Sequence, residues 1–205
     1  IGYNNSNPFS GNFDGNNKTI SNLQIDRTGG DWMGLFGQFL TATVKDLTLD
    51  GSKMFGKDTS GGFIGNMAVN SKAENCHVKN VDIVFTSYNV GGFTGSVLSG
   101  SQVINCSSKG SVVGVNQIGG FAGTSWNNSL ISKSFCEGTV AGQYIIGGFS
   151  GFVTFAFGPA TVNRIEDSYS RSNVTAISEQ VGGFYGSAQN TGNFKNVYST
   201  GTVNL

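Results

Sequence analysis

A six-residue phrase centred on Gly-Gly-Phe recurs through this chain and constrains its fold more than any other feature. Its six copies occupy residues 32–37, 60–65, 90–95, 118–123, 146–151 and 181–186. The second glycines stand at positions 34, 62, 92, 120, 148 and 183, so the intervals are 28, 30, 28, 28 and 35 residues. A period of about 20–50 residues indicates a solenoid, a propeller or an array. Solenoids present long surfaces of equivalent positions, which favours recognition or scaffolding over chemistry.

A second phrase follows each of these glycines and alternates small or apolar residues with larger ones. It reads NCHVKN at 75–80, NCSSKGSV at 105–112 and KSFCEGTV at 133–140. A period of two predicts a strand with one face toward a narrow interior. In the first phrase, flanking glycines on the same face leave room for an inward aromatic ring. We therefore expect one stacked core ladder, formed by Leu35, Phe63, Phe93, Phe121, Phe149 and Phe184.

These repeats predict an all-β chain, a right-handed parallel β-helix (β-solenoid) of about seven coils with about 28 residues per coil. The right hand follows from the chirality of parallel crossovers. Glycine, of which the chain has 32, is expected to supply the corners, where a positive φ is needed. A propeller blade needs about 40 residues, and helical solenoids are disfavoured by the glycine, serine, threonine and asparagine content. We expect one domain over residues 1–205, with repeat phrases at 32–51, 60–80, 90–112, 118–140, 146–174 and 181–203.

Charge excludes several classes of partner. The chain has 12 basic and 12 acidic residues, so its formal charge is zero, and charged residues make up 12% of it, about half the usual share. Nothing attracts nucleic acid or an anionic membrane, so neither is expected as a partner. Residues 140–162 carry no charge, but they contain five glycines and Pro159 and stay in register with the repeats. We expect no membrane insertion.

The phrase [VI]-G-G-F-x-G followed by N-C-x-x-x-G-[ST]-V resembles the GLUG repeat of bacterial surface proteins, with Phe mostly in place of Leu. PFSGNFDG at residues 8–15 also resembles the segment that often precedes such repeats. The resemblance covers nearly the whole chain. It implies a β-helix in large secreted or wall-attached proteins, including adhesins and the non-catalytic region of some immunoglobulin-cleaving metalloproteases. The repeat itself carries no catalytic residue.

The resemblance therefore implies an extracellular or cell-surface module that acts as an adhesin stalk, a binding surface or a structural filament unit. On this interpretation the chain is not an enzyme and needs no cofactor.

Residue chemistry agrees with that interpretation. His77 is the only histidine, and no H-E-x-x-H motif exists. Cys76, Cys106 and Cys136 are spaced by 30 residues, which no zinc motif uses, so we expect no metal site. A disulfide between Cys76 and Cys106 would have poor geometry because their side chains run parallel, so buried thiols are expected, with the redox state left open.

Two other functions remain open. A polysaccharide lyase or hydrolase needs clustered carboxylates, and acidic residues are densest in the first 58 positions, where Asp46 and Asp50 flank one strand. Each lies in a turn-like context, where aspartate normally bonds its own backbone. An ice-binding face would need a threonine ladder, but Asn173 interrupts the one formed by Ser111, Thr139 and Thr202.

The fifth repeat points to a candidate binding site. Its second phrase follows after 20 residues, from Gly148 to Ser168, where the usual distance is 14, as from Gly120 to Ser134. Insertions of this kind map to loops on one face, often the binding face. The candidate residues form an aromatic patch for sugar stacking or subunit contact: Trp126, Phe152, Phe155 and Phe157. The alternative is that these side chains fold back over the core.

The ends of the repeat array suggest further partners. STGTVNL at residues 199–205 stops where earlier copies continue toward another Gly-Gly-Phe. We expect neighbouring repeats, domains or subunits to cover the solenoid ends, and a glycan or surface receptor as the binding partner. Five N-glycosylation sequons would matter only in a source that uses them: Asn4, Asn17, Asn105, Asn127 and Asn173.

Overall fold

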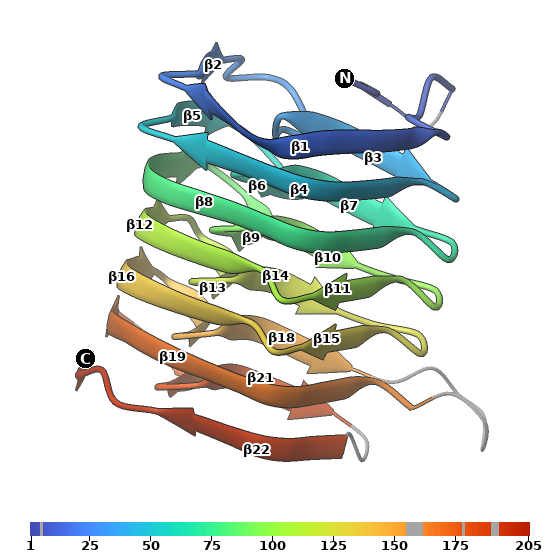
Figure 1. Cartoon of the computed structure of the whole chain (residues 1–205). Helices are drawn as coiled ribbons and strands as arrows, with labels where there is room; N and C mark the ends of the chain where they lie inside the picture. The colour runs from blue at the N-terminus through green and yellow to red at the C-terminus, as the bar shows by residue number, and fades with distance from the viewer. Residues whose placement is uncertain (5, 155–161, 178, 190–192) are drawn as a thin grey trace.

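The computed structural model is a stack of parallel β-strands wound into a solenoid of about six turns with about 29 residues per turn (Figure 1). It describes residues 1–4, 6–154, 162–177, 179–189 and 193–205. The predicted all-β solenoid is confirmed, and its size is close to the predicted seven coils of about 28 residues. No helix formed by these residues is long and apolar enough to cross a membrane.

Three parallel sheets run along the stack. The 12-stranded sheet contains β1 (Asn12–Ser21), β2 (Gln24–Asp26), β4 (Thr43–Asp50), β5 (Lys53–Gly56), β8 (Lys72–Phe85), β11 (Gln102–Ile104), β12 (Ser107–Val113), β15 (Leu130–Ser132), β16 (Phe135–Gly142), β19 (Arg164–Ala176), β22 (Asn193–Ser199) and β23 (Val203–Asn204). The 5-stranded sheet contains β6 (Ser60–Gly61), β9 (Tyr88–Gly91), β13 (Asn116–Gly119), β17 (Tyr144–Gly147) and β20 (Val181–Gly182). The 6-stranded sheet contains β3 (Phe36–Leu40), β7 (Ile64–Ala68), β10 (Thr94–Val97), β14 (Ala122–Ser125), β18 (Ser150–Thr154) and β21 (Tyr185–Gln189).

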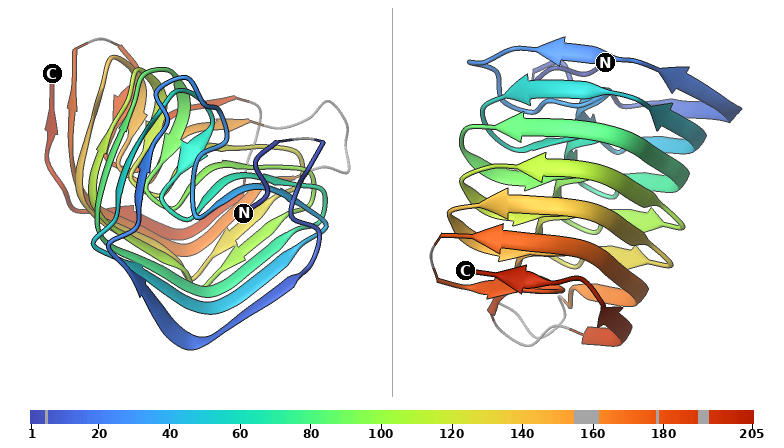
Figure 2. Two further views of the ribbon diagram at one scale, coloured as in Figure 1. Left: turned by 90° about the horizontal axis from the view of Figure 1, so that it is seen from above. Right: turned by 90° about the vertical axis from the view of Figure 1, so that its left-hand side faces the viewer.

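The five phrase copies from residue 60 onward span the corner between the two smaller sheets. Its first residues end a strand such as β13, and its last residues begin a strand such as β14. Viewed along the stack, the long strands of the largest sheet bend into a V, and the turns superimpose on one another (Figure 2). The same corner is therefore repeated at the same place in successive turns.

An aromatic ladder fills the interior. The rings of Phe63, Phe93, Phe121, Phe149 and Phe184 stack in sequence with centroid distances of 4.8–5.2 Å and interplanar angles of 2–8°. Four of these rings are fully buried, and Phe184 is partly buried. Because each turn advances by about 4.8 Å, equivalent rings are held at stacking distance along the whole core.

The first member of the predicted ladder differs from expectation. Leu35 is only partly buried, whereas the neighbouring Phe36 is fully buried, and its ring centroid lies 6.0 Å from that of Phe63. The ring centroid of Phe36 also lies 5.4 Å from that of Phe9 and 5.0 Å from that of Phe39, and the centroids of Phe9 and Phe39 are 5.4 Å apart. An aromatic cluster near the N-terminus thus takes over the first position of the ladder from Leu35.

The second phrase places small side chains inside. Cys76, Cys106 and Cys136 are buried free thiols. Burial raises the pKa of Cys136 to about 12, which keeps it protonated and unreactive at neutral pH. The larger residues that alternate with these small side chains face outward. Among them, the ring centroids of Phe135 and Tyr169 are 5.0 Å apart, and those of Tyr169 and Tyr198 are 5.2 Å apart.

Glycines serve the fold differently from the expected corner role. Only Gly2, Gly51, Gly100, Gly110 and Gly138 have a positive φ among the described glycines, and none of them belongs to a Gly-Gly-Phe phrase. The phrase glycines instead allow close approach: a Cβ on Gly62 would lie 3.2 Å from the Val78 side chain and against the carbonyl oxygen of Gly92. They keep successive corners narrow enough for backbone to pass over backbone.

The left-handed corner positions are held mainly by asparagine and aspartate. At the start of each second phrase, φ is 49–54° for Asp46, Asn75, Asn105, Lys133, Asp167 and Asn196. Side chains link neighbouring turns there: Asn75 Nδ2 donates to Asp46 Oδ1 at 2.9 Å, and Asn105 Nδ2 donates to Asn75 Oδ1 at 2.7 Å. Asparagine and aspartate tolerate this conformation because they bond locally with short polar side chains.

Lys133 interrupts this ladder, so Lys133→Asn is expected to stabilise the protein by about 1 kcal/mol. Asparagine adopts the left-handed backbone at lower cost and supplies an amide between Asn105 and Asp167. The thermal midpoint should rise by about 2–4 °C in a calorimetric scan. Lys195→Asn, which changes an exposed lysine of β22 without a positive φ, is the control and should leave the midpoint unchanged. An unchanged or lower midpoint for Lys133→Asn would contradict the strain argument.

Candidate functional site

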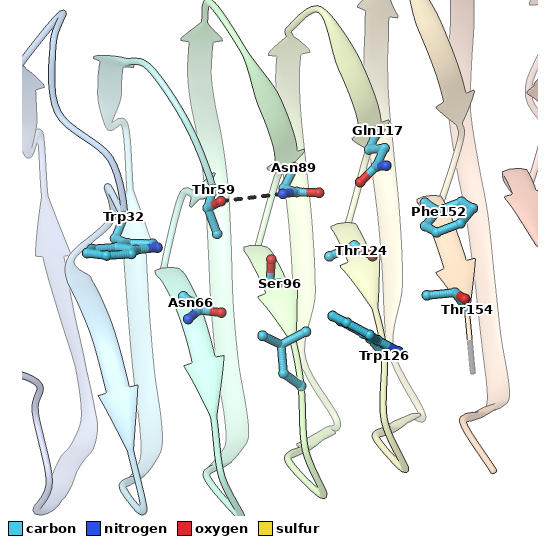
Figure 3. Close-up of a pocket in the computed structure, with 11 residues that line it drawn as sticks. Trp32, Thr59, Asn66, Asn89, Ser96, Gln117, Thr124, Trp126, Phe152 and Thr154 are labelled. Carbon is cyan, nitrogen blue, oxygen red and sulfur yellow. Dashed lines mark hydrogen bonds between the residues drawn. The ribbon is translucent and has the colours of Figure 1, made fainter. Parts of the chain in front are cut away.

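A groove of about 490 Å³ crosses several turns on the face formed by the two smaller sheets. Eleven residues line it: Trp32, Thr59, Asn66, Asn89, Ser96, Leu98, Gln117, Thr124, Trp126, Phe152 and Thr154 (Figure 3). They come from five successive turns, so with about 4.8 Å per turn the groove extends about 19 Å along the stack.

One row of groove residues follows the final glycine of each phrase. Asn66 pairs in register with Ser96, Ser96 with Thr124, and Thr124 with Phe152. Asn66, Ser96 and Thr124 are 8%, 3% and 8% exposed, which places them at the floor of the groove. The floor is therefore a line of small polar side chains, one from each turn, that ends at an aromatic ring.

A second row precedes the phrases. Thr59, Asn89 and Gln117 adopt φ values of 44°, 56° and 56°, and Asn89 Nδ2 donates to Thr59 Oγ1 at 3.4 Å. The same left-handed conformation recurs at the equivalent residues Ile145 and Gln180 of the later turns. The row thus forms a polar bank beside the floor.

Aromatic side chains bound the groove. Trp32 lies toward one end, and Trp126 and Phe152 lie toward the other (Figure 3). Trp126 is 44% exposed although it directly follows β14, while Trp32 and Phe152 are half-buried. Exposed or half-buried rings beside polar groups are suited to ligands that have both apolar faces and hydroxyl or amide groups.

The side-chain amides of Asn66 in the floor and Asn89 in the bank each have an oxygen that accepts no hydrogen bond from the residues that the structure describes. Asn66 Nδ2 donates to Gln38 Oε1 at 2.9 Å, but the Oδ1 atoms of Asn66 and Asn89 have no partner within the described part of the chain. A buried polar atom without a partner costs about 1–3 kcal/mol. Both oxygens are almost fully covered, so a hydroxyl or water in the groove would supply that partner only after a small rotation of the amide.

Charge is absent from the groove lining, since none of the eleven residues is Asp, Glu, Lys, Arg or His. Some acidic groups elsewhere form ion pairs at the surface. Lys45 Nζ lies 2.8 Å from Asp14 Oδ2, and Glu137 Oε2 lies 2.8 Å from Lys109 Nζ. The Lys45 ammonium lowers the pKa of Asp14, chiefly through their hydrogen bond.

His77 and the metal-ligating residue types form no recognisable centre. His77 Nδ1 lies 2.9 Å from Ser107 Oγ, and burial, with a contribution from Lys79, lowers the pKa of the imidazole. Within residues 1–4, 6–154, 162–177, 179–189 and 193–205, no three His, Cys, Asp or Glu side chains are grouped as metal ligands require.

The structure brings together half of the predicted aromatic patch. Trp126 and Phe152 line the groove, whereas Phe155 and Phe157 lie outside the described residues. Sequence analysis missed Trp32 and the polar rows. Their signal was positional, because Thr59, Asn89 and Gln117 directly precede a phrase and Asn66, Ser96 and Thr124 directly follow one.

Comparison with known proteins identifies the repeats. The protein family described as "The GLUG motif" matches this chain at residues 86–113 and 177–204. Halomucin of Haloquadratum walsbyi (strain DSM 16790 / HBSQ001) is 38% identical over 89 residues, which cover 43% of this chain and 1% of halomucin. The chain therefore corresponds to a very small part of that relative. The resemblance seen in the repeated phrases is confirmed at these two segments, and the chain is a β-solenoid that contains two matches to the GLUG motif.

Proposed function

We propose that this chain is a non-catalytic binding module of an extracellular surface protein and acts in the manner of an adhesin. The groove carries this proposal, because it presents neutral polar and aromatic side chains on a rigid stack of paired strands. Ligand sites of this kind combine apolar and aromatic walls with a few placed polar groups. The similarity of part of the chain to halomucin, whose name denotes a mucin, supports an extracellular location.

The solenoid also suits a stalk or filament unit. Its strands pair in parallel from β1 through β22, so load along the stack is shared by many backbone hydrogen bonds. Apolar side chains are exposed at the last turn, including Ile177 at 77% and Val203 at 44%. In the assembled protein, further repeats, another domain or a second subunit would cover this surface.

The competing carbohydrate-active enzyme would need carboxylates in the groove. None of the described residues that line the groove is a carboxylate. Asp46 and Asp50 in β4 accept hydrogen bonds from asparagine side chains. Asp46 Oδ1 accepts from Asn75, and Asp50 Oδ1 accepts from Asn80 at 2.8 Å. This arrangement supports binding without turnover.

The test combines binding with product analysis. The purified chain should bind saturably to one or more members of an array of glycans and surface proteins, and Trp126→Ala should weaken that binding. Tyr144→Ala, which removes a ring that is 50% exposed but outside the groove, is the matched control and should bind normally. Release of reducing ends or unsaturated sugars from a bound glycan would overturn the non-catalytic proposal.

A further inference from the structure

We propose that the groove binds a neutral polysaccharide strand that lies along the solenoid axis, with about one sugar residue per turn. This inference rests on the proposed binding function and specifies its ligand class. The groove, its unpartnered amides, its aromatic ends and its spacing each support it by a separate argument.

The lining selects an uncharged ligand. None of its eleven residues carries a charge. A polyanion such as nucleic acid or an acidic glycan would leave its charges unpaired there, since recognition of such groups depends on lysine and arginine. A cationic ligand would equally lack carboxylate partners. The ligand therefore binds through neutral hydrogen bonds and apolar contact.

The polar rows match hydroxyl groups. The groove presents the side chains of Ser96 and Thr124 at its floor, between Asn66 and the aromatic end. The Oδ1 atoms of Asn66 and Asn89 have no partner in the described structure and are almost fully covered, so each meets a ligand hydroxyl after a small rotation of its amide. A sugar hydroxyl both donates and accepts, and it can therefore satisfy an amide oxygen and a neighbouring hydroxyl together.

The aromatic rings match the apolar faces of a pyranose. Trp126 is 44% exposed beside a floor that is almost fully buried, so its ring presents apolar surface to solvent next to the polar row. Trp32 lies toward the other end of the same groove (Figure 3). A chain that spans both rings contacts an apolar platform near each end and amides between them.

The spacing favours an extended, periodic ligand that crosses the strands. The floor residues come from consecutive turns about 4.8 Å apart, which is close to the advance of one residue in an extended β-linked glycan. A peptide strand would instead need an unpaired sheet edge for backbone pairing. β10 and β14 are each paired on both sides, so the groove offers no such edge.

The test is calorimetric titration of the intact chain with neutral β-linked hexaoses: cellohexaose, mannohexaose, xylohexaose, laminarihexaose and chitohexaose. At least one should bind, and the matching disaccharide should bind at least tenfold more weakly because it contacts only part of the groove. Trp126→Ala should weaken binding by about threefold to tenfold. Asn66→Leu should also weaken it, and its melting curve separates a lost contact from lost folding. Tyr144→Ala should bind as the parent does.

Salt dependence separates neutral from charged ligands. The dissociation constant for the bound hexaose should change less than twofold between 50 and 500 mM NaCl, whereas polyanion binding weakens steeply over such a range. Failure of all five hexaoses, or binding confined to heparin, hyaluronan or a protein, would overturn the neutral-glycan inference. Binding to heparin, hyaluronan or a protein would leave the proposed binding function intact. That function would fail only if the array of glycans and surface proteins also showed no ligand.

Discussion

Phe121→Ala should lower the free energy of unfolding by about 3–5 kcal/mol, the usual cost of removing a buried aromatic side chain. Phe121 is fully buried and stacks between two other rings, with its ring centroid 5.1 Å from that of Phe93 and 4.9 Å from that of Phe149. Alanine would leave a cavity in the middle of the ladder and break both stacking contacts. Because the backbone of each turn is paired to its neighbours on both sides, the turns cannot collapse to fill that space.

Chemical denaturation monitored by circular dichroism measures this loss. Tyr144→Ala provides the control, since that ring is 50% exposed and its removal should change stability by less than about 0.5 kcal/mol. Equal denaturation midpoints for Phe121→Ala and the parent would show that the ring ladder does not hold the core together.

The ladder was predictable because both of its determinants are local in the sequence. The period sets which residues stack, and the glycines two before and two after each Phe show where a ring fits. The exception at Leu35 lies in the degenerate first copy, at the N-terminal end of the stack. Phe36 pairs in register with Ile64 and is fully buried as Ile64 is, and its ring lies 5.4 Å from that of Phe9, a residue that precedes the first repeat.

The groove was only partly predictable. An insertion pointed to Trp126 and Phe152, but nothing in the sequence indicates the angle at which β13 and β14 meet. In three successive turns, the corner between the two sheets brings the residue before the phrase and the residue after it to the same groove, although the six phrase residues separate them in sequence. Single polar residues such as Asn66 or Gln117 therefore look like ordinary loop or strand positions until the corner is formed.

Glycine was expected at the corners that need a positive φ, but most of those positions are held by other residues. Among the described residues, 22 non-glycine residues have a positive φ, many of them Asn. Asparagine can supply both the conformation and a hydrogen bond to the next turn, whereas glycine supplies only the first. Glycine is thus needed where another backbone passes within contact distance.

Gly120→Val should accordingly destabilise the protein by crowding rather than by backbone strain. A Cβ at this position would meet the carbonyl oxygen of Gly148 in the next turn, and it would lie 2.9 Å from Ser172 Oγ and 3.1 Å from Cys136 Sγ. The first of these atoms is backbone and is held by the sheet, so it cannot move aside as a flexible side chain would. Overpacking typically costs about 1–3 kcal/mol, and we expect at least the upper end of that range because both γ-methyl groups add to the clash.

Gly29→Val is the matched control for this prediction. A Cβ on Gly29 has no neighbouring atom within 4 Å, and the glycine has no positive φ. The two variants therefore add the same side chain and remove the same backbone freedom, and they differ only in the space around the new atoms. Gly120→Val should unfold at markedly lower denaturant concentration than Gly29→Val, which should match the parent. If both variants lost stability equally, the effect would come from the glycine backbone itself, and the close-approach role assigned to the Gly-Gly-Phe phrases would be wrong.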